Sequence, residues 1–436
     1  MHIVTSEEQL KATAGHVMMA QDLGWPDKQA YYKGLWAFYN TPGHAQYVGN
    51  TIGPDQDVIN TAAIHTMRSW GYYEDSLVGL TSIFDNLPAI RACPQYWLHN
   101  TQRAVWAATG PSLLSFMDKI REALHAGYFL ACPDASLHHL VRNGIKPHIV
   151  FTTERGPDTV KLFEMAEEAS DDLSGIIVNM GVYSHKNIYE FALAHSMRPT
   201  YHFRQQSEIF YLFPELKQGG PNVQWPTPHV AAPSWSWMFN RGIKELILFG
   251  QDLAYAPDGN SHAPGSHKDD WLPTLEKIPC KSNDGSDIFT NSYWAEWALD
   301  LSNMLEQKFK GVHVLNTASK GLPIRGTYYA TSEITFQQGP VATVVEAPGV
   351  ESIDLKIPLQ ELRKYHPEYL GRKHIDEFYK ESAAALFLGF PLTVNDYCRW
   401  QMERYAKGGK HDLKILRNLF KRAKYDLIRL LELARP

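Results

Sequence analysis

Residues 104–113 read Ala104-Val105-Trp106-Ala107-Ala108-Thr109-Gly110-Pro111-Ser112-Leu113. The first half is a short apolar run typical of a buried strand, and an amphipathic segment begins at Leu113. Gly110 and Pro111 indicate a tight turn between the two. A turn that opens a helix at the carboxyl end of a strand presents backbone N–H groups and the positive end of the helix dipole, so it is a candidate anion-binding site. The same residues are equally typical of an ordinary helix start, in which Pro111 occupies the first turn and Ser112 caps it.

The alternation of short apolar runs and helical segments continues from Arg103 to about residue 315. It predicts βα units, a parallel sheet and therefore an α/β fold of the Rossmann-like, doubly wound class over residues 101–330. Ligands of such sheets bind outside the carboxyl ends of the strands. We expect strands at 104–108, 128–132, 147–152, 175–180, 199–203, 245–249 and 312–315, and helices at 113–126, 135–143, 158–169, 186–195, 234–241 and 291–310.

Two flanking regions differ from this core. Residues 1–100 form a mixed, mostly helical N-terminal region, and residues 331–436 form a C-terminal helical domain. Between Arg404 and Arg429 there are nine Lys or Arg residues against two Asp. This basic stretch fits either a docking face for an acidic partner or the solvated face of a helical cap domain. The helices expected in the two regions are 6–19, 56–70, 376–387 and 413–433.

The composition is that of a soluble globular protein, with 44% hydrophobic and 20% charged residues among 436. The net charge of −5 gives no global attraction to nucleic acid or to anionic lipid. The four cysteines, Cys93, Cys132, Cys280 and Cys398, contain no CxxC pair, so neither a disulfide framework nor a structural zinc site is expected. We see no secretory signal and no apolar run of about 20 residues that would span a membrane, and we expect a reducing, cytoplasmic location.

Polar residues follow almost every predicted strand. Because the carboxyl ends of parallel strands meet at one edge of a sheet, we expect these residues to converge there. Taken singly, each is also a typical helix cap. The binding candidates are Thr109, Gly110, Pro111, Ser112, Asp134, Glu154, Arg155, Asn179, Gln251, Asn316 and Thr317.

A long loop of small and polar residues follows the strand at 245–249. It contains Asp252 and His262, which are our catalytic candidates. His262 has an ordinary pKa near neutrality and suits a general base, or it is a surface histidine in a mobile loop. His262 and His267 could hold a metal ion, although no third ligand is evident. Trp225, Trp235 and Trp237 precede the strand and either stack on a sugar or base or fill the core.

Several stretches together resemble the motility accessory factor (Maf) family, which is grouped with archaeal 6-hydroxymethylpterin diphosphokinases. They are Gly110-Pro111-Ser112-Leu113, Asp134 with the segment 140–148, Thr153-Glu154-Arg155, the segment 248–265, and the segment 316–327. The string Gly250-Gln251-Asp252-Leu253-Ala254-Tyr255 within the fourth stretch is the most specific. The resemblance covers residues 100–330. His148 stands where the family usually has Asp, and Thr109 replaces a Gly or Ala.

The resemblance implies a bacterial glycosyltransferase with a sialyltransferase-like core. It would transfer a nonulosonic acid, such as pseudaminic or legionaminic acid, from a CMP-activated donor to Ser or Thr of flagellin. In that reading the turn 109–112 binds the phosphate, and Asp134, Glu154 and Asn179 take the ribose and cytosine. Arg155 pairs with the donor's carboxylate or phosphate, or forms a salt bridge to Glu154 or Asp134.

On the other side of the donor, Gln251 and Asp252 close the site, and His262 deprotonates the acceptor. Asp252 alternatively orients a base or binds a divalent ion, so metal dependence stays open.

Two alternatives remain. The first is a pterin-type diphosphokinase that uses ATP and Mg²⁺, although no Walker A sequence is present. The second is a non-catalytic flagellin-binding protein that acts through the basic C-terminal helices. A binding preference for CMP would favour the glycosyltransferase, and a preference for ATP with Mg²⁺ would favour the diphosphokinase.

Overall fold

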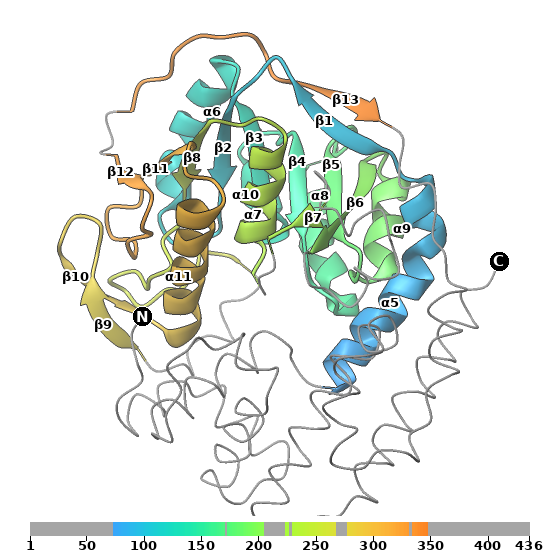
Figure 1. The fold of residues 1–436 in the computed structure, drawn as a ribbon, viewed down its shortest axis with the longest axis horizontal. Coiled ribbons are helices and arrows are strands. Elements are labelled where there is room, and N and C mark those ends of the chain that lie inside the picture. Colours follow the sequence, from blue (N-terminus) through green and yellow to red (C-terminus); the bar gives the residue numbers. More distant parts are fainter. Residues whose placement is uncertain are drawn as a thin grey trace, which may run out of the picture. The chain divides into compact units, whose positions relative to one another are not determined.

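A computed structural model describes residues 73–170, 172–204, 223–225, 229–266, 277–330 and 334–347 (Figure 1). Most of these residues belong to one compact unit made of Asn86–Gln205 and Gly219–Glu351. The helices predicted at 6–19, 56–70, 376–387 and 413–433 lie outside the described residues. The basic stretch 404–429, His267 and Cys398 lie outside them as well.

The centre of the unit is a nine-stranded sheet in which every neighbouring pair is parallel, as the sequence predicts. In spatial order its strands are β12 (Tyr328–Tyr329), β11 (His313–Asn316), β8 (Glu245–Phe249), β2 (Arg103–Ala107), β3 (Phe129–Pro133), β4 (Ile149–Thr152), β5 (Ile177–Gly181), β6 (Arg198–Arg204) and β7 (Val223–Gln224). The strands β2, β3, β4, β5 and β8 are buried on both faces, which explains why they are near-continuous apolar runs. The two-residue strands β7 and β12 extend the sheet beyond the prediction.

The order of the strands reverses between β2 and β8. From β2 the chain proceeds outward through β3 to β7, and it then returns to place β8, β11 and β12 on the other side of β2. The register pairs Ala107, the last residue of β2, with Phe249, the last residue of β8. Such a reversal is the topological switch point at which doubly wound sheets bind ligands.

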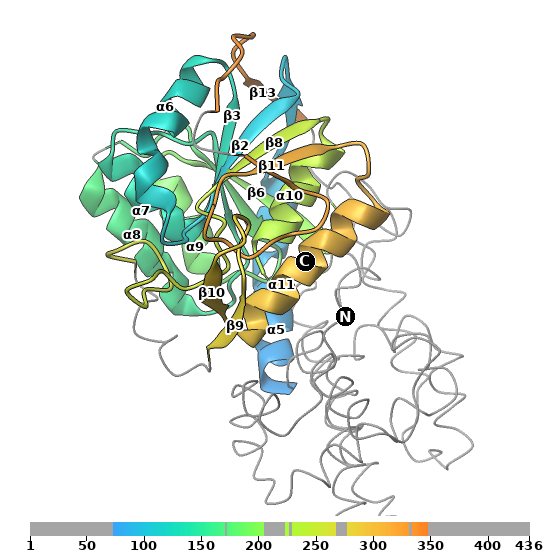
Figure 2. The same ribbon diagram turned by 90° about the vertical axis from the view of Figure 1, so that its left-hand side faces the viewer.

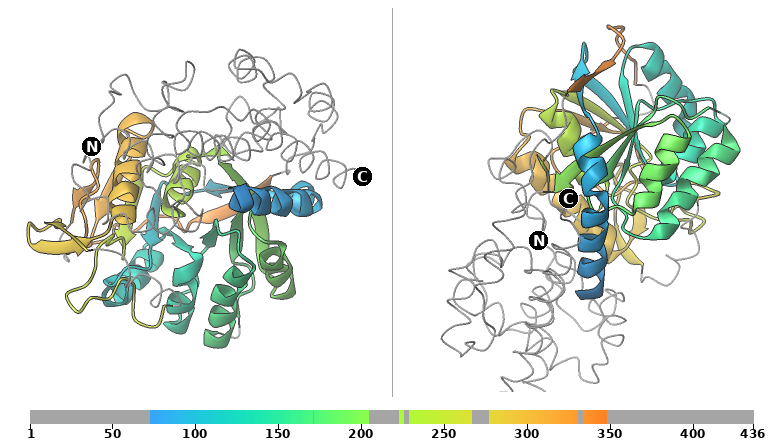
Figure 3. Two further views of the ribbon diagram at one scale, coloured as in Figure 1. Left: turned by 90° about the horizontal axis from the view of Figure 1, so that it is seen from below. Right: turned by 90° about the vertical axis from the view of Figure 1, so that its right-hand side faces the viewer.

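Helices cover both faces of the sheet, which makes the fold Rossmann-like and doubly wound (Figure 3). One face carries the helices that connect β2 to β6, and the other carries the helices that precede β8 and β11. The first set is α6 (Met117–His125), α7 (Asp134–Arg142), α8 (Val160–Ala169) and α9 (Lys186–Ala194), and the second is α10 (Ala231–Asn240) and α11 (Ser292–Gln307).

Two expected helices begin with a tighter turn. Leu113–Phe116 and Pro157–Thr159 are short 3₁₀ helices, η1 and η2, and the α-helices α6 and α8 start only after them. In η1 the Leu113 N–H donates to the Gly110 carbonyl (3.0 Å) and the Ser115 N–H donates to the Ser112 carbonyl (3.1 Å), which are three-residue contacts. The turn after β2 therefore does not open directly into an α-helix.

The core on the α10 side is built from aromatic side chains. Trp235 and Trp237 of α10 are buried, and Trp237 packs on Phe129 and edge-on against Phe151. Trp225 is partly buried against the same cluster. The core interpretation of these three tryptophans is confirmed.

Two antiparallel ribbons lie outside the central sheet, and neither is predicted by the sequence. β1 (Gln95–His99) pairs with β13 (Thr343–Ala347), and β9 (Ile278–Lys281) forms a hairpin with β10 (Asp287–Thr290). Because β1 and β13 belong to it, the compact unit extends beyond the predicted limits 101 and 330 at both ends. The helix α5 (Tyr73–Ala92) precedes β1, and its Asn86 amide donates to the carbonyls of Val182 and Ser184.

Candidate functional site

Ser112 and Asp252 meet at the switch point. Ser112 follows β2 and Asp252 follows β8, 140 residues later in the chain. The Ser112 hydroxyl donates to Asp252 Oδ2 at 2.8 Å, and the Ser112 N–H donates to the same oxygen at 3.2 Å. The Asp252 side chain is buried, with 5% of the residue exposed. One predicted binding residue and one predicted catalytic residue therefore form a direct contact.

Gly110 makes this contact possible. Its N–H donates to the Gly250 carbonyl at 2.8 Å, which continues the pairing of β2 with β8 beyond the strands. A Cβ at this position would overlap Asp252 Oδ2 and the Gly250 carbonyl oxygen and would lie 2.9 Å from Asp252 Cγ. Only glycine lets the carboxylate approach the turn this closely.

These contacts change the interpretation of the turn as an open anion site. The N–H groups of Gly110 and Ser112 already donate within the protein, and Pro111 has no N–H. The four-residue 3₁₀ helix η1 also lacks the dipole of a full α-helix. The anion that the turn binds in this structure is the protein's own Asp252 carboxylate.

Asp252 is electrostatically unusual. Burial raises its pKa to about 6, although the hydrogen bonds from Ser112 act in the opposite direction. At neutral pH the side chain is therefore mainly ionised but more basic than an ordinary aspartate. A carboxylate with these properties suits proton transfer near neutral pH.

The loop Gly250–Ser266 brings His262 to the same edge. The Ala263 N–H donates to the Thr109 carbonyl at 2.8 Å, so the residue after His262 is attached to the turn that follows β2. His262 is partly exposed, and its Nδ1 lies 2.9 Å from Ser261 Oγ. The loop is thus anchored beside the Ser112–Asp252 pair.

The far end of this loop is held on α7. The Ser266 hydroxyl donates to the Ala263 carbonyl (2.7 Å), so the His139 Nε2, 2.9 Å away, must be the donor to Ser266 Oγ. Burial lowers the pKa of His139 to about 4, which keeps the ring neutral and Nε2 protonated. Ser136, also on α7, donates to Thr109 Oγ1 at 3.2 Å. The helix therefore fixes both the loop and the turn.

Several predicted site residues are internal links. Asp134 Oδ1 accepts the Ala135 N–H (2.7 Å) and its Oδ2 accepts the Thr152 hydroxyl (2.6 Å), which joins α7 to the end of β4. Gln251 Oε1 accepts the indole N–H of Trp106 at 2.9 Å. Both side chains are buried, and their hydrogen bonds hold together the backbone segments at the carboxyl edge of the sheet.

The last strand of this half contributes two further buried links. Asn316, the last residue of β11, accepts the Ala318 N–H through Oδ1 (3.1 Å). Thr317 donates its hydroxyl to the Leu248 carbonyl (2.7 Å). Thr317 thus attaches the loop after β11 to β8, and Asn316 fixes the start of that loop.

Asn179 is not at a strand end. The strand predicted at 175–180 is Ile177–Gly181, so Asn179 is its central residue and is buried. Its Oδ1 lies 2.7 Å from Nδ1 of His202 on β6. The end of β4 instead contributes Glu154, which is exposed, and Arg155, whose guanidinium lies 5.2 Å from the centre of the ring of Tyr183, which follows β5.

Residues 81–258 match the family model described as 6-hydroxymethylpterin diphosphokinase MptE-like. We refer to this matching region as the MptE-like domain. The match begins in α5, contains the Ser112–Asp252 pair, and ends four residues before His262.

The fold is also similar to that of a solved structure, the Maf glycosyltransferase from Magnetospirillum magneticum AMB-1. The TM-score is 0.55 at 14% sequence identity, and the alignment covers 88% of this chain and 64% of that chain. The chain therefore spans less than two thirds of the length of that protein, and the similarity between the two concerns the fold. No curated protein sequence matches the chain. The resemblance to the Maf family is confirmed by the domain match and the fold together.

His148 of the MptE-like domain is structural. It precedes β4 and therefore lies at the amino edge of the sheet, opposite the Ser112–Asp252 pair. Its Nδ1 accepts the Leu130 N–H at 3.0 Å, its ring stacks on Phe129, and burial lowers its pKa to about 4. The departure from the family's Asp therefore does not touch the candidate site.

Other predictions concern metals, cysteines and membranes. Within the described ranges, no group of three or more His, Cys, Asp or Glu residues is placed to hold a metal ion. In the same part of the chain Cys93, Cys132 and Cys280 are free thiols. None of the helices described there is long and apolar enough to cross a bilayer.

The predicted site residues fall into two groups according to their solvent exposure. The turn Thr109–Ser112, Glu154, Arg155 and His262 are at least partly accessible, and a ligand can reach them. The remaining candidates, Asp134, Asn179, Gln251, Asn316 and Thr317, are buried, as is Asp252. Glu154 and Arg155 follow β4, two strands from β2, which corresponds to ~10 Å along the edge. The accessible group is therefore spread over a length that suits an extended ligand.

Proposed function

We propose that this chain is a glycosyltransferase that moves a nonulosonic, sialic-acid-like sugar from a CMP-activated donor to Ser or Thr of flagellin. The observation that carries the proposal is the buried Asp252 carboxylate, with its pKa of about 6, held by Ser112 at the switch point of the sheet. The MptE-like domain match and the fold similarity to a Maf glycosyltransferase support the same assignment.

The reaction requires one base and one anion site. The acceptor hydroxyl oxygen forms a bond to the anomeric carbon while the bond from that carbon to the phosphate oxygen breaks. CMP leaves with the electron pair, and the base takes the hydroxyl proton, so the anomeric centre is inverted. Asp252 suits the base because its raised pKa makes it a better proton acceptor than an ordinary carboxylate. Although it is buried, its hydrogen bond to the partly accessible Ser112 connects it to the part of the edge that a ligand can reach. His262, in the adjoining loop, is the second candidate.

We place the phosphate and carboxylate of the donor near the end of β4, away from Asp252 along the carboxyl edge of the sheet. An ionised Asp252 repels a phosphate from the turn at Ser112, where the N–H is already used. Arg155 supplies a cation that can bind a phosphate or carboxylate with two parallel hydrogen bonds. We therefore place the CMP end toward Arg155 and the anomeric carbon toward Asp252.

Intact-mass measurement of flagellin tests the proposal. Flagellin from cells that contain the gene product is expected to be heavier by one or more nonulosonic acid residues than flagellin from cells that lack it. D252A and H262A are both expected to abolish the increase without unfolding the protein. Flagellin of equal mass in both strains would contradict the acceptor, and full transfer by both purified variants would remove them from the catalytic residues. We expect the reaction in the cytoplasm.

A pterin diphosphokinase is the second candidate, because the matching family is described by that activity. Such an enzyme would bind ATP with Mg²⁺ and transfer a diphosphate to a small alcohol. Titration calorimetry with CMP and with ATP plus Mg²⁺ separates the two functions. Binding of CMP alone supports sugar transfer, and binding of ATP that depends on Mg²⁺ supports the kinase.

A further inference from the structure

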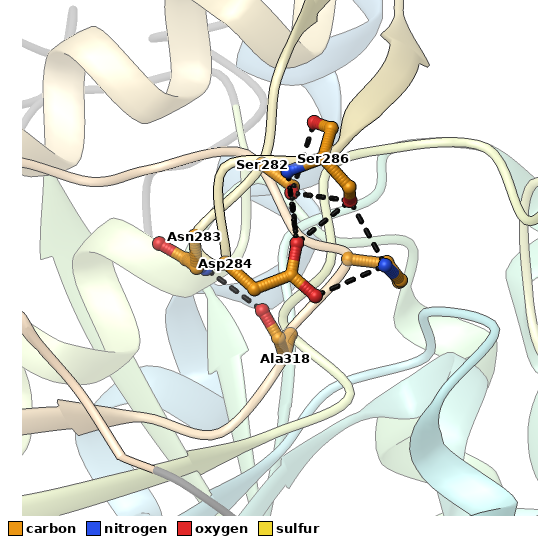
Figure 4. A network of polar contacts seen from close by, with 6 residues as sticks. Ser282, Asn283, Asp284, Ser286 and Ala318 are labelled. Atoms are coloured by element: carbon orange, nitrogen blue, oxygen red, sulfur yellow. Dashed lines mark hydrogen bonds and ion pairs between the residues drawn. The ribbon is translucent and has the colours of Figure 1, made fainter.

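The β9–β10 hairpin is attached at its turn to the loop that follows β11. The Asn283 N–H donates to the Gly321 carbonyl (2.9 Å), and the Asn283 side-chain amide donates to the Ala318 carbonyl (2.8 Å). Asp284 forms an ion pair with Lys320 (3.0 Å). Figure 4 shows Asp284 beside Ser282 and Ser286. The hairpin turn is thus fixed to the carboxyl edge of the central sheet.

Asp284 organises the turn itself. Its Oδ1 accepts the hydroxyls of Ser282 and Ser286, both at 2.6 Å. These hydrogen bonds, followed by the one from Lys320, hold the pKa of Asp284 well below its usual range. The turn is therefore rigidly bonded at neutral pH, although it is exposed to solvent.

The other end of the hairpin is attached to the loop that carries Asp252. The buried Thr290, 2% exposed, donates its hydroxyl to the Leu253 carbonyl at 2.7 Å. The Tyr255 N–H donates to the Phe289 carbonyl at 2.8 Å. The hairpin leads directly into α11 (Figure 2), so Thr290 is held by regular structure on both sides.

Leu253 is the residue that needs such a restraint. Its φ is +49°, in the left-handed region that a leucine rarely adopts. A residue with a side chain is strained in this region, so the conformation persists only where its surroundings impose it. Leu253 directly follows Asp252, whose carbonyl accepts the Leu322 N–H at 2.7 Å. The backbone that follows the Asp252 Cα is therefore held from outside the loop at two successive carbonyls.

We propose that Thr290 is a positioning residue: its hydroxyl holds Leu253 in the left-handed conformation and so directs the Asp252 carboxylate at Ser112. The catalytic consequence rests on the function proposed above, in which Asp252 acts in sugar transfer. The positioning itself is independent of any activity. Among residues of the chain that the structure describes, Ser112 is the side chain that bonds to the Asp252 carboxylate, and burial is the main influence on its charge.

The first test follows the titration of Asp252 by carbon-13 NMR of aspartate-labelled protein, with D252N used for assignment. T290V is expected to lower the midpoint by about half a pH unit or more, because a carboxylate released from its position gains solvent. T290S keeps the hydroxyl and is expected to titrate like the wild type. An unchanged or raised midpoint in T290V overturns the proposal.

T200V is the matched control. Thr200 is likewise buried, 1% exposed, and its hydroxyl donates to the Pro94 carbonyl at 2.8 Å, but it belongs to β6. It is expected to lose a similar amount of thermal stability and to leave the midpoint of Asp252 in place. If T290V does not fold, the pair L253G/T290V replaces it, because glycine adopts the positive φ without strain. A downward shift of the midpoint is expected for the pair as well, because glycine permits the positive φ but does not impose it once the Thr290 hydroxyl is gone.

The second test measures transfer of the sugar from a CMP-activated donor. T290V is expected to lower kcat about tenfold while the KM for the donor changes about twofold or less, since the donor's anions bind elsewhere. A shifted midpoint with unchanged kcat would leave the positioning intact and refute the role of Asp252 in the proposed reaction. An unshifted midpoint refutes the positioning, whatever the activity.

Discussion

Replacement of Gly110 by alanine is the most direct test of the geometry at the switch point. The added Cβ would overlap the Gly250 carbonyl oxygen, which belongs to the backbone and cannot rotate away. It would also overlap Asp252 Oδ2, so the carboxylate would have to leave Ser112. G110A therefore disrupts both the backbone pairing beyond the ends of β2 and β8 and the Ser112–Asp252 contact.

The magnitude follows from these two losses. Overpacking of a close contact costs about 1–3 kcal/mol. Loss of hydrogen bonds to a charged group costs about 1.5–3 kcal/mol. Because the two effects share atoms, we expect the free energy of unfolding to fall by about 3–5 kcal/mol in total. For a unit of this size, that corresponds to a decrease in Tm of roughly 6–15 °C.

Two other glycines provide graded controls in the same assay, which is thermal and urea unfolding followed by circular dichroism. At Gly156 the backbone is ordinary (φ −72°) and a Cβ would meet nothing within 4 Å, so G156A should change stability by about 0.5 kcal/mol or less. At Gly144 the space is also open but φ is +70°, so G144A should cost about 1–2 kcal/mol. If G110A is no less stable than G144A, the proposed close approach of Asp252 to the turn is refuted.

Three further predictions concern titration and stability. The folded-state pKa of Asp252, about 6, lies above its ordinary value of about 3.9, so the stability that its neutral form contributes is present below pH 4 and lost as the pH rises to 6. D252N should therefore gain roughly 2–3 kcal/mol relative to the wild type between pH 4 and pH 7 in urea unfolding, and a pH-independent difference would contradict this. S112A removes a hydrogen bond that favours the ionised form, so the NMR midpoint of Asp252 should rise above 6; a fall would show that Ser112 does not stabilise the carboxylate. His148 has a pKa lowered to about 4 by burial, so its contribution to stability is complete above pH 6.5 and lost as the pH falls through 4. H148F should cost about 1–3 kcal/mol at pH 7, because the Leu130 N–H loses its acceptor, and should reduce the acid sensitivity in this range; unaltered stability at pH 7 would mean that the N–H finds another partner.

The sheet could be predicted from the sequence because its strands are buried on both faces. Apolar runs such as Glu245–Phe249 are continuous, and glycine, proline or polar residues end each of them. The ribbons β1–β13 and β9–β10 could not be predicted in this way. They include strands that are exposed or only partly buried, such as Thr343–Ala347, and their pairing partners are distant in the chain or lie across a short turn.

The contact between Ser112 and Asp252 was only partly predictable. The carboxyl ends of parallel strands meet at one edge of the sheet, so both residues are expected there. This expectation does not predict that Ser112 donates hydrogen bonds to Asp252. Asn179 shows the limit of the same rule, because a shift of one or two residues in the strand boundary moves a side chain from the edge into the core. Thr290 and the left-handed Leu253 leave no signal in the sequence, since neither residue type indicates its conformation.

The pairing of β1 with β13 has a consequence for the architecture of the chain. Gln95 lies opposite Ala347, so the two points where the polypeptide enters and leaves the sheet-bearing core are neighbours (Figure 1). Adjacent ends are what allow a domain to be inserted into a host protein or circularly permuted without disturbing its interior. The first and last strands of this core thus bring the preceding and following parts of the chain to adjacent positions, which favours the exchange of those parts during evolution.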